Sequence, residues 1–314
     1  VRAALAWGYS RGSRITQGAT GHPARMMPDE AATREGHEMF DLPELTVIAA
    51  QMNDVLPGLV VAAGTIGVSP HRFVWYDREP EEFAALTAGL RVGRAWAEGK
   101  WLFVPLEPGR VLLIGEWGGR IRYHADAADL PAKRHLDLTF TTGAALSATT
   151  QMWGGVHLVE AGREREVKYV KEMRPTPLDE RFDRAYFGEL VAAAGEDGRR
   201  SVKGLLTQEQ LIPGLGNAIA QDIMARARLH PRRPLSTLDE VQLEGLYEAI
   251  TETVRAVIAA GGRSDERDLF GHPGGYARLM DARAVGRPCV TCGTPVEKIS
   301  YLGGACYFCP ACQT

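Results

Sequence analysis

The chain has 314 residues, of which 45% are hydrophobic and 24% charged, and its formal net charge is −3. This composition is that of an ordinary globular protein, so it excludes a wholly disordered chain, a collagen and a coiled coil. No apolar run approaches the roughly 18–20 residues of a membrane span, and the net charge taken alone argues against a nucleic-acid-binding protein.

The first 38 residues differ from the rest, because they mix Gly, Ala, Arg, Thr and Pro without helical or strand periodicity. We predict that residues 1–38 are disordered or a non-native extension, with Met39 as an alternative start. All five cysteines lie within the last 26 residues, and no secretory signal follows Val1. We therefore expect a reducing, cytoplasmic location and no contact with a membrane.

Residues 39–165 are predicted to form one domain. Apolar residues recur at helical spacing over Leu45–Leu56. Short strand-like segments, separated by Gly, Pro and Asp, then follow at Leu59–Val68, Phe73–Tyr76, Leu90–Ala97, Trp101–Leu106, Val111–Trp117, Ile121–Tyr123, Leu136–Thr141 and Val156–Leu158. The pattern predicts a β-sandwich or barrel-like domain with a leading helix.

Residues 166–275 are predicted to be a helical domain, and residues 276–314 a separate module. Helices are expected over Arg181–Ala194, over Lys203–Gln208 and through Ile219–Met224. A last helix is expected to open on a capping box at Thr237 and Glu240 and to stop at Gly261-Gly262. The fold class predicted from these elements is α+β.

Two pairs of cysteines give the most selective signal in the chain. Cys289 and Cys292 form one C-x2-C pair, sixteen residues separate the pairs, and Cys309 and Cys312 form the second. Two such pairs supply four thiolates for tetrahedral Zn²⁺, with no open position for water, so we expect one structural zinc ion. Cys306 breaks the spacing and is expected to be a small buried residue.

A glycine-rich turn, Pro213-Gly214-Leu215-Gly216-Asn217, precedes a helix. Such a turn presents backbone N–H groups to an anion, although a tight interhelical turn has the same sequence pattern. Residues 199–233 contain seven basic and two acidic residues, among them Lys203, within a chain of negative net charge. This local excess of positive charge favours phosphate contact and therefore duplex DNA or structured RNA.

With these motifs the chain resembles the formamidopyrimidine-DNA glycosylase/endonuclease VIII family over about residues 39–314. Pro213-Gly-Leu-Gly-Asn217 is similar to the helix-two-turn-helix element of that family, and Cys289 to Gln313 is similar to its zinc finger. Met39-Phe-Asp-Leu-Pro-Glu44 resembles the family's start, Met-Pro-Glu-Leu-Pro-Glu. Lys100 matches a lysine that reaches DNA near the lesion.

The resemblance implies an N-terminal β-sandwich with a leading helix, a helix-two-turn-helix domain, a terminal β-hairpin zinc finger, and damaged duplex DNA bound by a monomer on the nucleoid. It also implies base excision with a flipped-out base. In the family, the amine of an N-terminal proline attacks C1′ and forms a Schiff base, elimination cuts the strand, and a neighbouring Glu moves protons. Gly214, Gly216, Asn217 and Lys203 are expected to contact DNA.

The chain departs from the family pattern at the catalytic positions. Phe40 stands in place of the nucleophilic proline, so the secondary amine is missing, and Asp41 replaces the partner Glu. The family loop Asp-Pro-Arg-Arg-Phe-Gly is absent near Thr149–Trp153. Met152 and Trp153, or Trp117, could act instead as apolar wedges in DNA, although packing in a sheet is the alternative for each.

The remaining chemistry is carried by three residues. Asp41 and Glu44 could orient water or stabilise a cationic sugar, or they could simply be acidic residues at a helix N-terminus. Lys100 could bind phosphate or serve as a Schiff-base amine. Three functions follow: a DNA glycosylase with doubtful AP-lyase activity, a catalytically silent protein that binds damaged DNA or abasic sites, and a zinc-ribbon regulator that contacts proteins.

Overall fold

The computed structural model describes residues 40–116, 118–150 and 152–314. The predictions for residues 1–38, Met39 and Trp117 therefore lie outside the described residues. The helices are α1 (Leu42–Val55), α2 (Pro80–Thr87), α3 (Lys168–Lys171), α4 (Arg184–Gly195), α5 (Val202–Thr207), α6 (Asn217–Arg226) and α7 (Glu240–Ala259). The strands are β1 (Val61–Ile66), β2 (Val74–Tyr76), β3 (Arg91–Val92), β4 (Trp96–Glu98), β5 (Trp101–Glu107), β6 (Arg110–Gly115), β7 (Gly119–His124), β8 (Leu136–Phe140), β9 (Ala145–Thr150), β10 (Gly154–Glu160), β11 (Glu297–Tyr301) and β12 (Gly304–Phe308).

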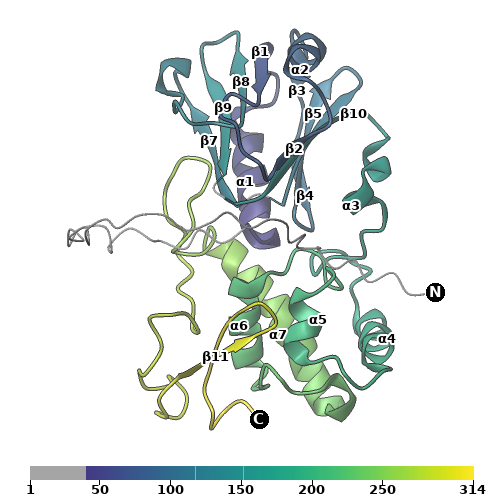
Figure 1. The fold of residues 1–314 in the computed structure, drawn as a ribbon, viewed down its shortest axis with the longest axis vertical. Coiled ribbons are helices and arrows are strands. Elements are labelled where there is room, and N and C mark those ends of the chain that lie inside the picture. The colour runs from purple at the N-terminus through teal and green to yellow at the C-terminus, as the bar shows by residue number, and fades with distance from the viewer. Residues whose placement is uncertain (1–39, 117, 151) are drawn as a thin grey trace, which may run out of the picture. The chain divides into compact units, whose positions relative to one another are not determined.

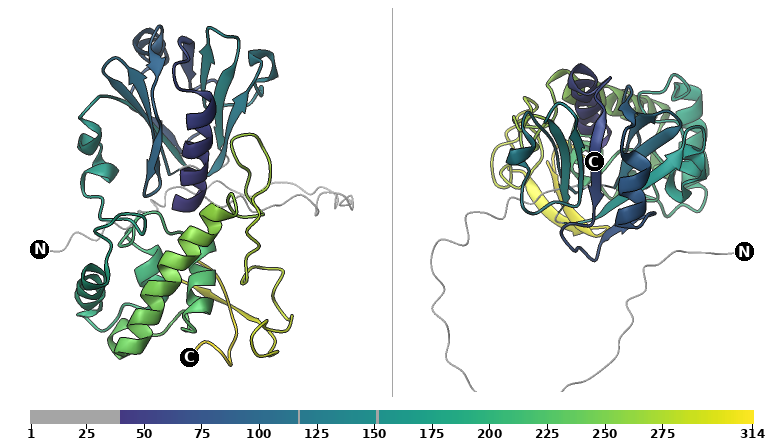
Figure 2. Two further views of the ribbon diagram at one scale, coloured as in Figure 1. Left: turned by 180° about the vertical axis from the view of Figure 1, so that it is seen from behind. Right: turned by 90° about the horizontal axis from the view of Figure 1, so that it is seen from above.

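The N-terminal half is the predicted sandwich. One sheet has the order β1-β8-β9-β7, and the other has the order β2-β10-β6-β5-β3, with β4 paired to β5. Helix α1 stands between the two sheets (Figures 1 and 2). Its residues Leu45, Ile48 and Met52 are buried in one core with inward-facing residues of both sheets. The amphipathic spacing seen in the sequence therefore places α1 in the core, with its first residue at one end of the sandwich.

Several predicted elements of this half were wrong in detail. The segment Leu90–Ala97 is not one strand but the separate strands β3 and β4, because the register against β5 shifts by one residue between the pairs Val92–Leu106 and Trp96–Phe103. Helix α2 was missed, although Pro80 at its first position and an acidic first turn are ordinary helix-start signals. Strand β9 was missed because its small residues show no clear alternation.

The C-terminal half is helical, as predicted, with a core built from α4, α5, α6 and α7. The predicted cap of the last helix was wrong. Asp239, not Thr237, is the N-cap of α7, and its carboxylate accepts the N–H of Gln242, because Leu235–Thr237 is occupied by a 3-10 turn. The antiparallel hairpin β11–β12 follows at the C-terminus.

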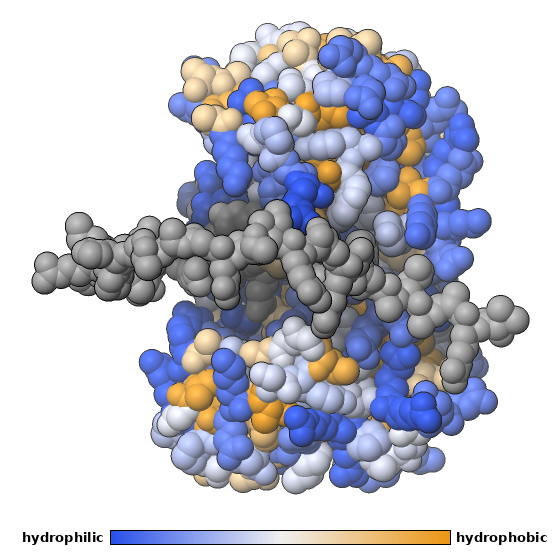
Figure 3. All heavy atoms as spheres, viewed as in Figure 1, coloured by the Kyte–Doolittle hydropathy of each residue, from blue (hydrophilic) through white to orange (hydrophobic). Residues whose placement is uncertain are grey.

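The face seen in Figure 3 is largely hydrophilic where the described residues are visible, and hydrophobic residues appear there in small scattered groups. Within the described ranges, no helix is long and apolar enough to cross a membrane.

Candidate active site

The first turn of α1 meets the glycine-rich turn of the helical half. Asp41 is the N-cap residue of α1, and the N–H of Leu42 donates to the carbonyl of Gly214 at 2.8 Å. A Cβ at Gly216 would clash with the Asp41 carboxylate, and one at Gly214, whose φ is +89°, would clash with Leu42. The two glycines are therefore required for this close approach, which brings the predicted residues Asp41, Gly214 and Gly216 together.

The Asp41 carboxylate faces Lys100 from the turn between β4 and β5. Lys100 Nζ lies 3.6 Å from Asp41 Oδ1, and the two residues are 5% and 1% exposed. The other oxygen, Asp41 Oδ2, is buried and accepts no hydrogen bond from the described residues. A buried carboxylate oxygen without a hydrogen-bond donor is costly, so this atom has room for a hydrogen bond from a water or a substrate.

Arg263 closes the site from the opposite side and was not identified from the sequence. Its Nε donates to Glu44 Oε1 at 2.9 Å, and its Nη1 lies 3.9 Å from Asp41 Oδ2. Its Nη2 lies 3.6 Å from Glu266 Oε1. Burial raises the pKa of Glu44, and burial raises the pKa of Glu266 to about 8. Arg263 directly follows Gly261-Gly262. In the sequence this glycine pair predicts only the end of the last helix, and it gives no indication that the next residue belongs to the site.

Glu44 also has the helix-start role that the sequence left open. Its Oε2 accepts the N–H of Asp41 at 3.3 Å, the reciprocal contact of a capping box. The same carboxylate is 4% exposed and ion-paired with Arg263. Glu44 therefore anchors Arg263 beside Asp41 while it completes the start of α1.

Glu116 is a second residue that sequence reasoning missed. It has a left-handed backbone, with φ of +49°, and its N–H donates to the carbonyl of Lys100 at 3.0 Å. A non-glycine residue in this conformation is uncommon and often marks a functional position. Burial raises the pKa of the Glu116 carboxyl, and the nearby charge of Lys100 only partly opposes this rise. The Glu116 carboxyl group is thus held near Lys100 and Asp41.

The residues just described form one cluster, the acidic centre, in which all side chains are buried except the partly exposed Glu116: Asp41, Glu44, Lys100, Glu116, Arg263 and Glu266. Four carboxyl groups share two cations, so a carboxyl group with a raised pKa lies near the ion-paired Asp41. Carboxyl groups with a raised pKa are common at sites of acid–base chemistry.

Asn217 and Lys203 contact the C-terminal hairpin. The Nδ2 of Asn217 donates to the carbonyl of Ala305 at 3.4 Å, and Lys203 Nζ donates to the carbonyl of Tyr301 at 2.6 Å. Lys203 is 1% exposed, so its charge is directed into the contact between α5 and the hairpin. Of the seven basic residues counted over 199–233, the exposed ones are Arg199, Arg226, Arg228 and Arg232.

The four predicted metal ligands come together. The sulfur atoms of Cys289, Cys292, Cys309 and Cys312 all lie within 4.8 Å of one another. The Cys292–Cys309 and Cys289–Cys312 separations are 3.4 and 4.0 Å. Zn–S bonds of ≈ 2.3 Å in a tetrahedron put sulfurs about 3.8 Å apart, so this cluster fits a tetrahedral metal ion. Cys306 is fully buried outside the cluster, as expected.

The predicted wedge residues lie at the end of the β2–β10 pair. Met152 is 38% exposed, whereas Trp153 is half-buried and stacks on Trp75.

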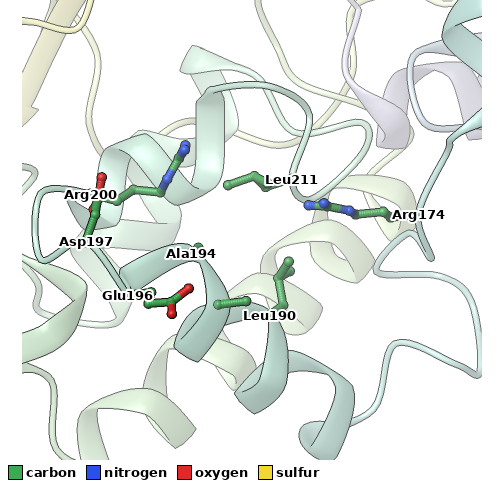
Figure 4. Close-up of a pocket in the computed structure, with 8 residues that line it drawn as sticks. Arg174, Leu190, Ala194, Glu196, Asp197, Arg200 and Leu211 are labelled. Atoms are coloured by element: carbon green, nitrogen blue, oxygen red, sulfur yellow. The ribbon is translucent and has the colours of Figure 1, made fainter. Parts of the chain in front are cut away.

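A separate pocket of about 400 Å³ lies in the helical half, with Arg174 and Arg200 on opposite sides of it (Figure 4). No residue of the acidic centre lines that pocket, so it is not part of the candidate active site.

Phe40 occupies the place where the family resemblance puts the nucleophilic proline. Its side chain is 1% exposed and belongs to the core between the two sheets. A phenylalanine supplies no secondary amine, whether or not residues precede it. The nucleophile that the family resemblance implies is therefore replaced by a core residue.

Comparison with known proteins agrees with this geometry. Residues 39–153 match the formamidopyrimidine-DNA glycosylase N-terminal domain, and residues 173–267 match the formamidopyrimidine-DNA glycosylase H2TH domain. A formamidopyrimidine-DNA glycosylase of Nocardioides sp. strain JS614 is 31% identical over 288 residues, which cover 88% of this chain and 94% of the relative. The corresponding protein of Listeria innocua is 27% identical and is covered completely, over 88% of this chain.

Solved structures agree as well. The MutM (Fpg) protein of Thermus thermophilus has a TM-score of 0.74 at 27% identity, over 87% of this chain and 98% of that one. Fpg of Lactococcus lactis, solved with DNA containing an abasic site, has the same fold, with a TM-score of 0.77 at 22% identity over 87% and 99%. This chain belongs to the formamidopyrimidine-DNA glycosylase family.

Proposed function

We propose that this protein is a DNA glycosylase of base excision repair that removes a damaged base by hydrolysis and leaves the strand uncut. The observation that carries the proposal is the pairing of a buried Asp41–Lys100 contact with a core-packed Phe40. The family places DNA glycosylase activity on this scaffold, and the acidic centre retains acid–base groups where the proline amine is missing.

The reaction consumes one water. The bond from C1′ to the base nitrogen breaks, and the oxygen of the water bonds to C1′. Asp41 orients that water, stabilises the positive charge that develops on the sugar, and accepts the proton that the water loses. Glu116, whose pKa is raised by burial, is the proposed donor of a proton to the departing base. Lys100 holds Asp41 in place and is proposed to interact with a backbone phosphate near the lesion.

The DNA partner is held by both halves. We assign a phosphate contact to Asn217 at the start of α6, because a helix N-terminus favours anions, and we assign to Gly214 and Gly216 the support of this turn against Leu42 and Asp41. Lys203 is buried and supports the hairpin through Tyr301, so it acts on DNA binding through the position of the hairpin and not by direct phosphate contact. Met152 and Trp153 are candidate wedges in the damaged duplex.

The metal ion of this protein is proposed to be Zn²⁺. Four thiolates leave no open position, so the ion stabilises the hairpin and takes no part in the reaction. The hairpin is held against α6 by Gln221, whose Nε2 donates to the carbonyl of Ala305 at 2.8 Å. The ion thereby fixes the position of β12 beside Asn217.

We further propose a monomer that acts on chromosomal DNA in the cytoplasm. Its domains are proposed to span residues 39–165, 166–275 and 276–314, with residues 1–38 outside them.

The test is base release from a panel of duplexes that carry oxidised purines, oxidised pyrimidines, alkylated bases or an abasic site. The wild-type protein is expected to release at least one base, and Asp41→Asn should lower that rate by about 10²-fold or more. Asp54→Asn, an exposed residue near the end of α1, is the matched control. If no lesion is released while the abasic duplex is bound tightly, the silent binding protein is the correct function.

A further inference from the structure

Three aromatic residues at the edge of the second sheet form what we call the aromatic stack: Phe73, Trp75 and Trp153. The rings of Trp75 and Trp153 are nearly parallel, at 9° and 5.7 Å between centroids, and Phe73 lies 4.6 Å from Trp153. Trp75 is 45% exposed, although a side chain of this size is usually better covered. The stack leaves an open aromatic surface at the protein exterior.

Strand register explains why Trp75 is exposed. Trp75 pairs with Gly155, Gly155 pairs with Gly115, and Gly115 pairs with Trp101 across the sheet. The ring of Trp101 fills the space over Gly115, where a Cβ would clash with it. Because β2 is an edge strand, Trp75 is flanked by another strand, β10, on one side only.

The aromatic stack lies at the same end of the sheet as the acidic centre. The N–H of Gly118 donates to the carbonyl of Trp153 at 3.1 Å. Gly118 is two residues from Glu116, whose own N–H donates to the carbonyl of Lys100. Two residues span at most about 7 Å, so the stack and the acidic centre share one edge of the molecule.

The chemistry of the stack points to a nucleobase. The Arg72 guanidinium lies 4.6 Å from the centre of the Phe73 ring, so a cation flanks the aromatic surface. A flat π surface beside a guanidinium suits a nucleobase and the phosphate next to it. Such stacking does not depend on which of the four bases is bound. Bases inside a duplex are covered on both faces by their neighbours, so only an unpaired base can reach Trp75.

We propose that the aromatic stack binds a base of locally unpaired DNA, with Trp75 as the stacking surface and Arg72 near the adjoining phosphate. The inference rests on the proposed function in requiring DNA as the partner. Stacking of an unpaired base on Trp75 makes the protein bind DNA with an open bubble more tightly than a fully paired duplex.

The experiment measures the binding of labelled DNA by fluorescence anisotropy at one salt concentration. The two probes have equal length, one fully paired and one with a three-nucleotide bubble. The wild-type protein is expected to bind the bubble more tightly. Trp75→Ala should weaken bubble binding by about tenfold and paired-duplex binding by less than twofold, whereas Trp75→Phe should retain the preference.

The matched control is Trp96→Ala, because Trp96 is 40% exposed and stacks on Phe103 at 4.9 Å elsewhere on the same sheet. Trp96→Ala should change neither affinity, and thermal melting should show that all variants fold. Equal losses for both probes in Trp75→Ala, no loss, or no wild-type preference for the bubble would each overturn the proposal. The experiment measures DNA binding and does not measure base release. Its result therefore does not depend on whether the protein is an active glycosylase.

Discussion

Lys100 Nζ and Asp41 Oδ1 lie 3.6 Å apart in a site where the two residues are 5% and 1% exposed. The contact joins the start of β5 to the start of α1, and Gly216 packs against the same carboxylate. An ammonium held in such an ion pair has no free lone pair for attack on C1′. The pair therefore supports hydrolysis assisted by Asp41 over Schiff-base formation by Lys100.

Glu116→Gln is expected to lower the rate of base release by about 10²-fold, because the proton donor of the reaction is lost. Burial raises the pKa of Glu116, so its protonated form persists to a higher pH than for an ordinary glutamate. The wild-type rate should fall as the pH rises through that pKa. The rate of the variant should not show this alkaline fall, and single-turnover rates across pH measure both effects.

The control for Glu116 is Glu82→Gln, which changes a carboxylate that is half exposed on α2. This variant should keep the wild-type rate and pH profile. A Glu116→Gln protein that retained the alkaline fall would assign the titration to another group and remove Glu116 from the mechanism.

Arg263→Met is expected to lower the free energy of unfolding by about 3–5 kcal/mol, because it leaves Glu44 buried without its partner. Urea denaturation measures the change. Arg255→Met, on the exposed side of α7, should change stability by less than about 0.5 kcal/mol. Adding Glu44→Gln to Arg263→Met should restore part of the loss. If Arg263→Met were as stable as the wild-type protein, the buried ion pair would not hold the site together.

Cys309→Ser is expected to remove the metal ion and to weaken DNA binding by about tenfold or more, because the hairpin beside Asn217 loses its anchor. Elemental analysis should find one zinc per wild-type chain and none in the variant. Cys306→Ser is the control, since Cys306 lies outside the cluster, and it should retain the metal. Retention of zinc by Cys309→Ser would contradict the proposed ligand set.

The sequence predicted best those parts of the site whose partners are close in the chain or carried by a family motif. Two C-x2-C pairs identify four metal ligands because each pair is local. Lys100 and Asp41 were found through the resemblance. Arg263 was not, since its partner Glu44 lies 219 positions away and only the fold brings them together.

Exposure and backbone conformation were the other quantities that the sequence did not supply. Glu116 lies within the predicted strand Val111–Trp117, whereas β6 ends at Gly115, and its left-handed backbone and raised pKa appear only in the structure. Trp75 lies in the predicted strand Phe73–Tyr76, but its exposure depends on β2 being an edge strand next to Gly155. Lys203 differs from its sequence-based expectation in the other direction. The sequence predicts that it contacts DNA, but in the structure it is buried against Tyr301.

The most direct test of the account is borohydride trapping during base release from the best lesion of the panel. We predict that free base accumulates, that the strand stays intact, and that no covalent protein–DNA adduct forms. A trapped adduct that disappears in Lys100→Met would contradict this account, because it would make the Lys100 amine the nucleophile in place of water activated by Asp41.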